Sequence, residues 1–261
     1  MKYISYSFKG NDSLGVIFKD KIFDLSLLSK GKISNNMMDF LTNFDSNHSW
    51  VKTNVKGDEK EYLNIADVVV NPPISRPHSF RDAYAFRQHV AAGRKSRGLE
   101  MIPEYDEFPV FYFSNHNSII GPGYVEVESK HLNKLDFELE IGILISKKGK
   151  NIKSKDAHNY IAGFMIMNDW SARTMQFEEM KLNLGPAKGK DFSTSIGPYL
   201  VTRDELDDYC NYTLNNSKYD LEMKAFINDV QVSSDNMKNM SWSFSEIIER
   251  ASYGATLFPG D

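Results

Sequence analysis

The chain of 261 residues is poor in cysteine, with Cys210 as its single one. An intrachain disulfide is therefore impossible, which is typical of proteins in a reducing compartment. A catalytic role for Cys210 is not expected, because acidic residues within the polar stretch 207–211 disfavour a reactive thiolate.

Long apolar runs and an excess of positive charge are also absent. No run approaches the roughly 20 apolar residues of a membrane-spanning helix, and the first residues lack the apolar region of a signal peptide. The net charge of −4 argues against a partner that is a nucleic acid or a membrane surface. With 41% hydrophobic and 25% charged residues, the composition predicts an ordinary globular protein, and we expect a cytoplasmic one.

A phosphate-binding loop is absent as well. The glycine-containing basic stretch 184–194 does not match the P-loop pattern, because Gly185 and Gly189 are one residue too close and Asp191 follows Lys190. A nucleotide site is therefore not expected.

A small β domain is predicted over residues 1–70. Short runs of alternating polarity at residues 2–8, 13–18 and 21–25 are separated by turn-forming residues, and residues 37–44 have helical spacing. Pro72 and Pro73 then interrupt the chain. We therefore expect a second domain over residues 71–261.

An acidic strand is predicted at residues 135–145. Asp136, Glu138 and Glu140 alternate with apolar residues, so the three acids share one face of a strand. Three neighbouring carboxylates are costly to desolvate, and a bound Mg²⁺ or Ca²⁺ is a usual compensation. The alternative from this pattern alone is a solvated acidic edge strand.

A helix is predicted over residues 80–93, ending at Gly93. Asp82 and His89 would share one face of it, about 10 Å apart along the axis. That spacing suits a metal-binding carboxylate and a general base at two ends of a substrate. The alternative is an aspartate favoured by the helix dipole and an unrelated surface histidine.

A further acidic residue follows the apolar run 160–167. Asp169 is placed either as a site residue at the end of a buried segment or as a helix N-cap. Arg173 and Gln176 follow at helical spacing, so the three residues can share a helix face.

Taken in order, these pieces resemble the fumarylacetoacetate hydrolase family from about residue 80 to residue 261. The matching motifs are Asp82 with His89, Glu138-x-Glu140, Asn168-Asp169-Trp170-Ser171-Ala172-Arg173 with Gln176, Gly189-Lys190-x-Phe192 with Gly197-Pro198, and residues 253–261. The resemblance implies an α+β, β-rich fold: a fumarylacetoacetase-like mixed β-roll with a small N-terminal β domain. It also implies a homodimer.

The resemblance further implies roles for individual residues. A divalent cation, Mg²⁺ or else Mn²⁺ or Ca²⁺, would be held by Asp82, Glu138, Glu140 and Asp169, with Thr194 beside it. The family's catalytic positions are matched by His89 as general base and by Lys190. Substrate contacts are matched by Tyr84, Gln176 and Arg173, and also by either Arg94 or Arg97.

The expected function is therefore a metal-dependent hydrolase that cleaves a C–C bond in a β-diketo acid, with His89 activating water. Two alternatives stay open: a decarboxylase or isomerase of a β-keto acid that acts through a metal-bound enolate, and a catalytically incomplete metal-binding homologue. The family continues beyond the motif Pro259-Gly260-Asp261 with a Gly-Thr-containing strand, so we expect the catalytic domain to be truncated at its C-terminus.

Overall fold

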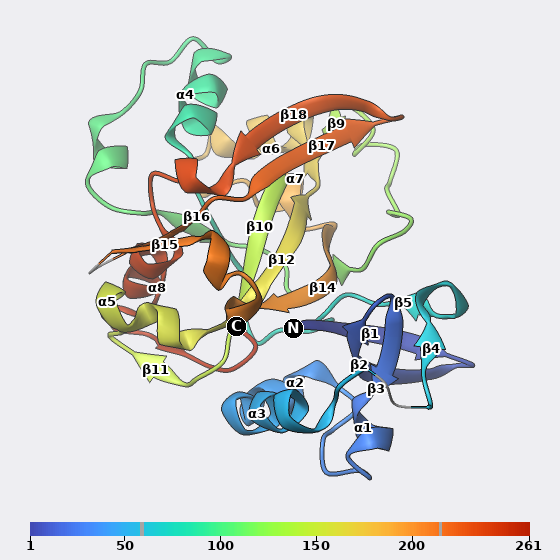
Figure 1. The fold of residues 1–261 in the computed structure, drawn as a ribbon. Coiled ribbons are helices and arrows are strands. Elements are labelled where there is room, and N and C mark those ends of the chain that lie inside the picture. Colours follow the sequence, from blue (N-terminus) through green and yellow to red (C-terminus); the bar gives the residue numbers. More distant parts are fainter. Residues whose placement is uncertain (58–59, 214–215) are drawn as a thin grey trace.

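The computed structural model describes residues 1–57, 60–213 and 216–261. Within them the main sheet has nine strands, in the order β10-β12-β14-β1-β2-β3-β4, with β5 beside β1 and β8 parallel to β14 (Figure 1). The strands are β1 Lys2–Phe8, β2 Asn11–Phe18, β3 Lys21–Asp24, β4 Leu63–Asn64, β5 Val69–Val70, β8 Ile119–Ile120, β10 Leu139–Ile145, β12 Ile161–Asp169 and β14 Thr194–Thr202.

The remaining described strands form two-stranded sheets, paired as β6 with β7, β9 with β13, β11 with β19, β15 with β16 and β17 with β18. Their bounds are β6 Arg81–Ala83, β7 Phe111–Phe113, β9 Leu135–Asp136, β11 Gly149–Lys150, β13 Ser171–Ala172, β15 Cys210–Thr213, β16 Asn216–Tyr219, β17 Glu222–Ile227, β18 Val230–Asn236 and β19 Thr256–Leu257. The α+β, β-rich class is thereby confirmed.

The helices of the described chain are short. They are α1 Leu25–Leu28, α2 Met37–Thr42, α3 Phe44–Asn54, α4 Arg87–Lys95, α5 Ser154–Ala157, α6 Arg173–Met180, α7 Ala187–Lys190 and α8 Phe244–Ser252. Over the residues described, none is both long and apolar enough to cross a lipid bilayer.

The N-terminal strands continue the sheet that carries the site. β1 pairs antiparallel with β14, with Tyr3 opposite Leu200, and both residues lie in one core cluster with Phe40 of α2 and Met165 of β12. The strands predicted between positions 2 and 25 are confirmed. The division into two domains at residue 70 stays a prediction.

A second core lies beneath α8 and supports the other side of β10 and β12. Ile248 of α8 packs in one cluster with Phe164 and Tyr219. The helix begins with a capping box, in which Glu246 N–H donates to Ser243 Oγ at 3.3 Å and Ser243 N–H donates to Glu246 Oε2 at 2.9 Å. These bonds fix the start of α8.

The prediction of a helix over residues 80–93 was wrong for the first half of that range. Residues 81–83 form β6, in which Asp82 lies directly opposite Tyr112 of β7, and the helix begins only at Arg87. Local propensity favoured a helix here, but pairing with a strand distant in sequence decided the backbone. Asp82 and His89 therefore do not share a helix face.

The acidic strand was predicted as continuous, and this was also wrong. It is interrupted at Phe137 and Glu138, because β9 pairs with β13 whereas β10 pairs with β12. The placement of Asp169 and Arg173 on one helix face was wrong too, since Asp169 ends strand β12 and α6 begins at Arg173.

Asp204 anchors the N-terminal part to the end of β14. Burial would raise its pKa, but hydrogen bonds from Lys52 Nζ at 2.7 Å and from Thr202 Oγ1 at 2.5 Å lower the pKa well below its usual range. A lowered folded-state pKa adds stability that is complete above the unfolded pKa, about 4, and is lost as the pH falls below it.

Asp204→Asn should therefore lower the free energy of unfolding at pH 7 by about 1 kcal/mol, a value reduced for solvent screening because the side chain is partly exposed. The loss should shrink as the pH falls through 4 and below, as measured by urea denaturation at each pH. A loss that is the same at pH 7 and pH 3 would contradict the electrostatic origin.

Candidate functional site

Three acidic side chains from separate strands converge at one point. Asp82 comes from β6, Glu140 from β10 and Asp169 from the end of β12, and each offers a carboxylate oxygen that lies within 4.8 Å of the other two. Asp82 and Asp169 are buried, whereas Glu140 is partly buried. We call these three residues the carboxylate cluster.

Lys190 lies at the edge of the carboxylate cluster. Its Nζ donates to Asp169 Oδ2 and to Ser171 Oγ, the latter at 2.7 Å, and lies 3.0 Å from Glu138 Oε2. Burial alone would lower the pKa of Lys190, but the negative charges of Asp169 and Glu138 raise it, so the amine is held in its charged form.

A glycine permits Lys190 to reach this position. Lys190 ends α7, which packs on α6, and a Cβ at Gly189 would lie 2.5 Å from the Cβ of Gln176. Any side chain at position 189 would therefore push the two helices apart.

Glu138 forms ion pairs with basic side chains and is not a member of the carboxylate cluster. Its Oε1 is 2.7 Å from Arg173 Nη1, and Arg173 also donates to Gln176 Oε1 at 3.0 Å. Burial would raise the pKa of Glu138, but Lys190, Arg173 and His89 lower it to about 2. Glu138 is thus a charged acceptor that holds the basic side chains around the carboxylate cluster.

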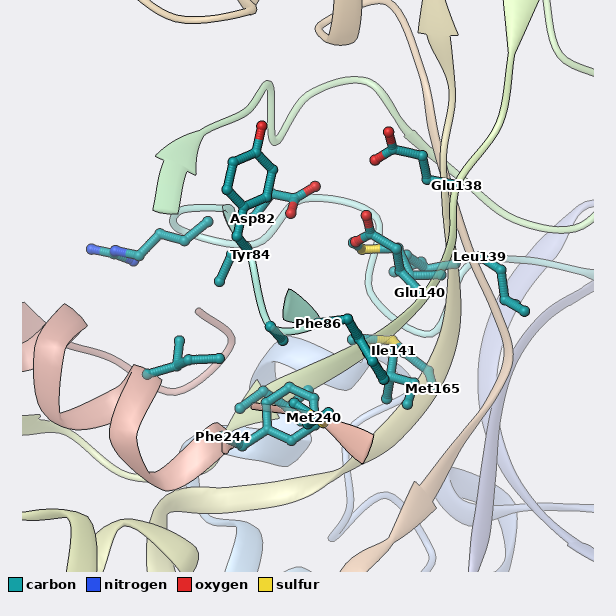
Figure 2. Close-up of a pocket in the computed structure, with 18 of the residues that line it drawn as sticks. Asp82, Tyr84, Phe86, Glu138, Leu139, Glu140, Ile141, Met165, Met240 and Phe244 are labelled. Atoms are coloured by element: carbon teal, nitrogen blue, oxygen red, sulfur yellow. The ribbon is translucent and has the colours of Figure 1, made fainter. Parts of the chain in front are cut away.

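Figure 2 shows the carboxylates of Asp82, Glu138 and Glu140 pointing into one space, with Tyr84 beside them. The space is a cavity of about 960 Å³ whose walls also include His89. Its far side is apolar and includes the labelled residues Phe86, Ile141, Met165, Met240 and Phe244.

His89 is an exposed residue of the site. Its side chain is 54% exposed, and its Nε2 lies 3.9 Å from Glu138 Oε1. A second cavity of about 550 Å³ is lined by His89, Tyr84, Gln176 and both Arg94 and Arg97. The histidine therefore stands between the carboxylate cluster and a space lined by basic and aromatic side chains.

The carboxylate cluster is poorly compensated by the protein alone. Burial, followed by the negative charge of neighbouring carboxylates, raises the pKa of both Asp82 and Glu140 well above the usual range. Burial also raises the pKa of Asp169. Asp169 Oδ1 is buried and has no hydrogen-bond partner among the described residues.

These features fit a divalent cation. Carboxylate oxygens are the ligands that Mg²⁺, Mn²⁺ and Ca²⁺ prefer, and an orphaned buried oxygen in a group of three acids is what such an ion would satisfy. The residues suited to hold it are Asp82, Glu140 and Asp169.

The structure places the predicted residues in three positions relative to the carboxylate cluster. Glu138, Lys190, Arg173 and Gln176 form the charged network described above. Thr194 is buried opposite Asp169 in the pairing of β12 with β14. Tyr84, His89, Arg94 and Arg97 line the cavities.

Two further residues of the site were not predicted from the sequence. Tyr112 OH contacts Asp82 Oδ2 at 3.1 Å and Asp169 Oδ2 at 2.8 Å, and Ser171 Oγ accepts from Lys190. Tyr112 stands between two phenylalanines and resembles an ordinary strand residue. The sequence did contain a signal for Ser171, since this residue lies within the motif that contains Asp169.

Comparisons with known proteins identify a family. A family model described as fumarylacetoacetate (FAA) hydrolase, C-terminal, matches residues 78–261. The fumarylacetoacetase of Oryza sativa subsp. japonica is 31% identical over 196 residues, which cover 61% of this chain and 46% of that protein. The mitochondrial oxaloacetate tautomerase Fahd2a of Rattus norvegicus is 33% identical over 155 residues, which cover 59% of this chain and 46% of that protein.

The chain spans about half of the length of these curated relatives. A solved structure gives the same fold: maleylpyruvate hydrolase from Sphingobium sp. SYK-6, in complex with manganese(II) ion and pyruvate, has a TM-score of 0.75 at 20% identity, covering 100% of this chain and 86% of that chain.

The relatives therefore include hydrolases and a tautomerase. The family model covers the strands and helices that carry Asp82, Glu140, Asp169 and Lys190. On this match, the chain belongs to the fumarylacetoacetate hydrolase family.

Proposed function

We propose that this protein is a divalent-metal-dependent hydrolase that cleaves a C–C bond in a β-diketo acid. The observation that carries the proposal is the carboxylate cluster with an unsatisfied buried oxygen, beside a cavity that also exposes His89. The relatives named fumarylacetoacetase and maleylpyruvate hydrolase support it.

His89 is assigned as the general base. It is exposed to the cavity, and Glu138 lies close enough to stabilise the imidazolium that forms when His89 accepts a proton. Water that has lost this proton attacks one carbonyl carbon of the substrate. The bond between that carbon and the neighbouring methylene carbon then breaks, and its electron pair leaves on the methylene carbon, which is finally protonated.

Lys190 is assigned to the stabilisation of negative charge. It is buried, held by Asp169, Ser171 and Glu138, and kept positively charged. A fixed positive charge in a site with little water stabilises an oxyanion without reorganisation during the reaction. Arg173 and Gln176, which are bonded to each other, are assigned to the substrate's carboxylate and carbonyl oxygens.

A bound Mg²⁺ or Mn²⁺, or else Ca²⁺, would supply Lewis-acid chemistry to the substrate's keto oxygens. Asp82, Glu140 and Asp169 are the residues that would hold it, with Glu138 and Thr194 as neighbours.

A second candidate is keto–enol tautomerisation, or decarboxylation, of a β-keto acid. The relative named oxaloacetate tautomerase favours tautomerisation. The same groups suffice, because neither reaction needs an attacking water. In tautomerisation His89 would move a proton between carbon and oxygen, and in decarboxylation it would protonate the enolate that remains when CO₂ leaves.

Product analysis tests the two candidates. The protein, loaded with Mg²⁺ or Mn²⁺, is incubated with acylpyruvates, fumarylacetoacetate and oxaloacetate in ¹⁸O-labelled water. Hydrolysis puts the label into a new carboxylate, whereas tautomerisation leaves the carbon skeleton intact and decarboxylation releases CO₂. The hydrolase proposal fails if every substrate consumed gives products with no new labelled carboxylate.

A further inference from the structure

Tyr112 links two members of the carboxylate cluster. It lies directly opposite Asp82 in the pairing of β6 with β7, and side chains of such pairs project to the same face of a sheet. Its hydroxyl contacts Asp82 Oδ2 at 3.1 Å and Asp169 Oδ2 at 2.8 Å. The hydroxyl has one proton, so that proton is shared between the two carboxylates.

The two oxygens of Asp169 have opposite environments. Oδ2 accepts from Lys190 Nζ as well as from Tyr112 OH. Oδ1 is buried without any hydrogen-bond partner in the part of the chain that the structure describes. A carboxylate held through one oxygen presents the other in a fixed direction, which suits coordination of an ion through a single oxygen.

We propose that Tyr112 is a positioning residue, which fixes Asp82 and Asp169 so that Asp169 offers only Oδ1 to a divalent cation. This inference rests on the proposed function, in which the carboxylate cluster holds such a cation. Groups that bond to metal ligands typically change metal affinity by about 10- to 100-fold when they are removed.

The same geometry predicts a preference among cations. Mg²⁺ and Mn²⁺ favour small octahedral sites, whereas Ca²⁺ accepts two oxygens of one carboxylate and a looser arrangement. Removing the Tyr112 hydroxyl leaves Oδ2 with Lys190 as its remaining donor and lets the Asp169 carboxylate turn. The affinity for Mn²⁺ should therefore fall more than the affinity for Ca²⁺.

The test compares the unchanged protein with Tyr112→Phe by isothermal titration with Mn²⁺ and with Ca²⁺, in the absence of substrate. Tyr6→Phe is the matched control, because Tyr6 OH donates to Asp24 Oδ2 at 2.7 Å in the N-terminal strands. Tyr112→Phe should weaken Mn²⁺ binding by about 10- to 100-fold and Ca²⁺ binding by less. Tyr6→Phe should change neither.

The outcomes separate this inference from the proposed function. If the unchanged protein binds neither ion, both fail. The positioning role alone fails if the unchanged protein binds Mn²⁺ and Tyr112→Phe binds both ions as tightly as the unchanged protein does. It also fails if Tyr112→Phe lowers the affinity for both ions to the same extent.

A shape-matched pair of variants covers the case in which Tyr112→Phe does not fold. Position 112 can carry 4-aminophenylalanine, which retains an N–H donor, or 4-fluorophenylalanine, which does not. The first should retain Mn²⁺ affinity and the second should lose it, and equal affinities would overturn the inference.

Discussion

His89→Ala is expected to lower kcat by about 10²- to 10⁴-fold, the usual contribution of a general base, while the affinity for Mn²⁺ is retained. The reason is geometric. His89 lies on α4, exposed to the cavity, and its Nε2 lies 3.9 Å from the carboxylate of Glu138, which is not a member of the carboxylate cluster. Removing the imidazole deletes the proton acceptor without deleting a ligand.

The measurement is steady-state kinetics on the substrate that the product screen identifies, together with Mn²⁺ titration. His158→Ala is the matched control, because His158 lines neither of the two cavities described. A His89→Ala protein that retains full metal-dependent activity would remove the base from the scheme. Loss of Mn²⁺ binding in this variant would instead point to a ligand role.

The second large effect is expected for Glu140→Gln, which should weaken Mn²⁺ binding by more than about 100-fold, since a direct ligand matters more than the groups around it. The same change should stabilise the metal-free protein. Burial, followed by the negative charge of Asp82 and Asp169, disfavours the Glu140 carboxylate in the folded protein, and an uncharged amide at this position removes that cost.

The gain in stability should be on the order of 1 kcal/mol, the free energy of one pKa unit, and urea denaturation in a chelating buffer measures it. Glu249→Gln is a control for which we expect a change in stability of the opposite sign. Glu249 pairs with Lys153 at 3.2 Å and accepts from Ser154 N–H at 2.8 Å, so its removal should destabilise the protein. A metal-free Glu140→Gln protein that is less stable than the unchanged one would contradict the cost assigned to the Glu140 carboxylate.

The sequence predicted best where the pattern is local. The runs of alternating polarity between positions 2 and 25 became strands, because period-two patterns decide such segments. At residues 80–93 the local signal failed, since Asp82 is held in β6 by its pairing with β7. That partner strand is Phe111–Phe113, too distant in sequence for any local pattern to reveal it.

The site itself could be predicted only in part from the sequence pattern. Strand periodicity suggested Glu138 and Glu140 as equivalent acids, yet Glu138 pairs with Arg173 and Lys190 while Glu140 joins the carboxylate cluster. Glu138 lies in the break between β9 and β10, whereas Glu140 lies within β10. The family motifs identified the residues, but only the three-dimensional structure shows which charged groups pair with each other.

The pairing of β10 with β12 also bears on where related chains can gain or lose residues. Glu140 lies opposite Met167, and the ladder stays regular until it shifts between Leu144 and Ile145, at the end away from the carboxylate cluster. An insertion near that bulge can be absorbed by it. One extra residue placed between Glu140 and the bulge would reverse the alternation and replace an acid by an apolar side chain. Length variation among homologues should therefore be tolerated after residue 145 and selected against within 139–144.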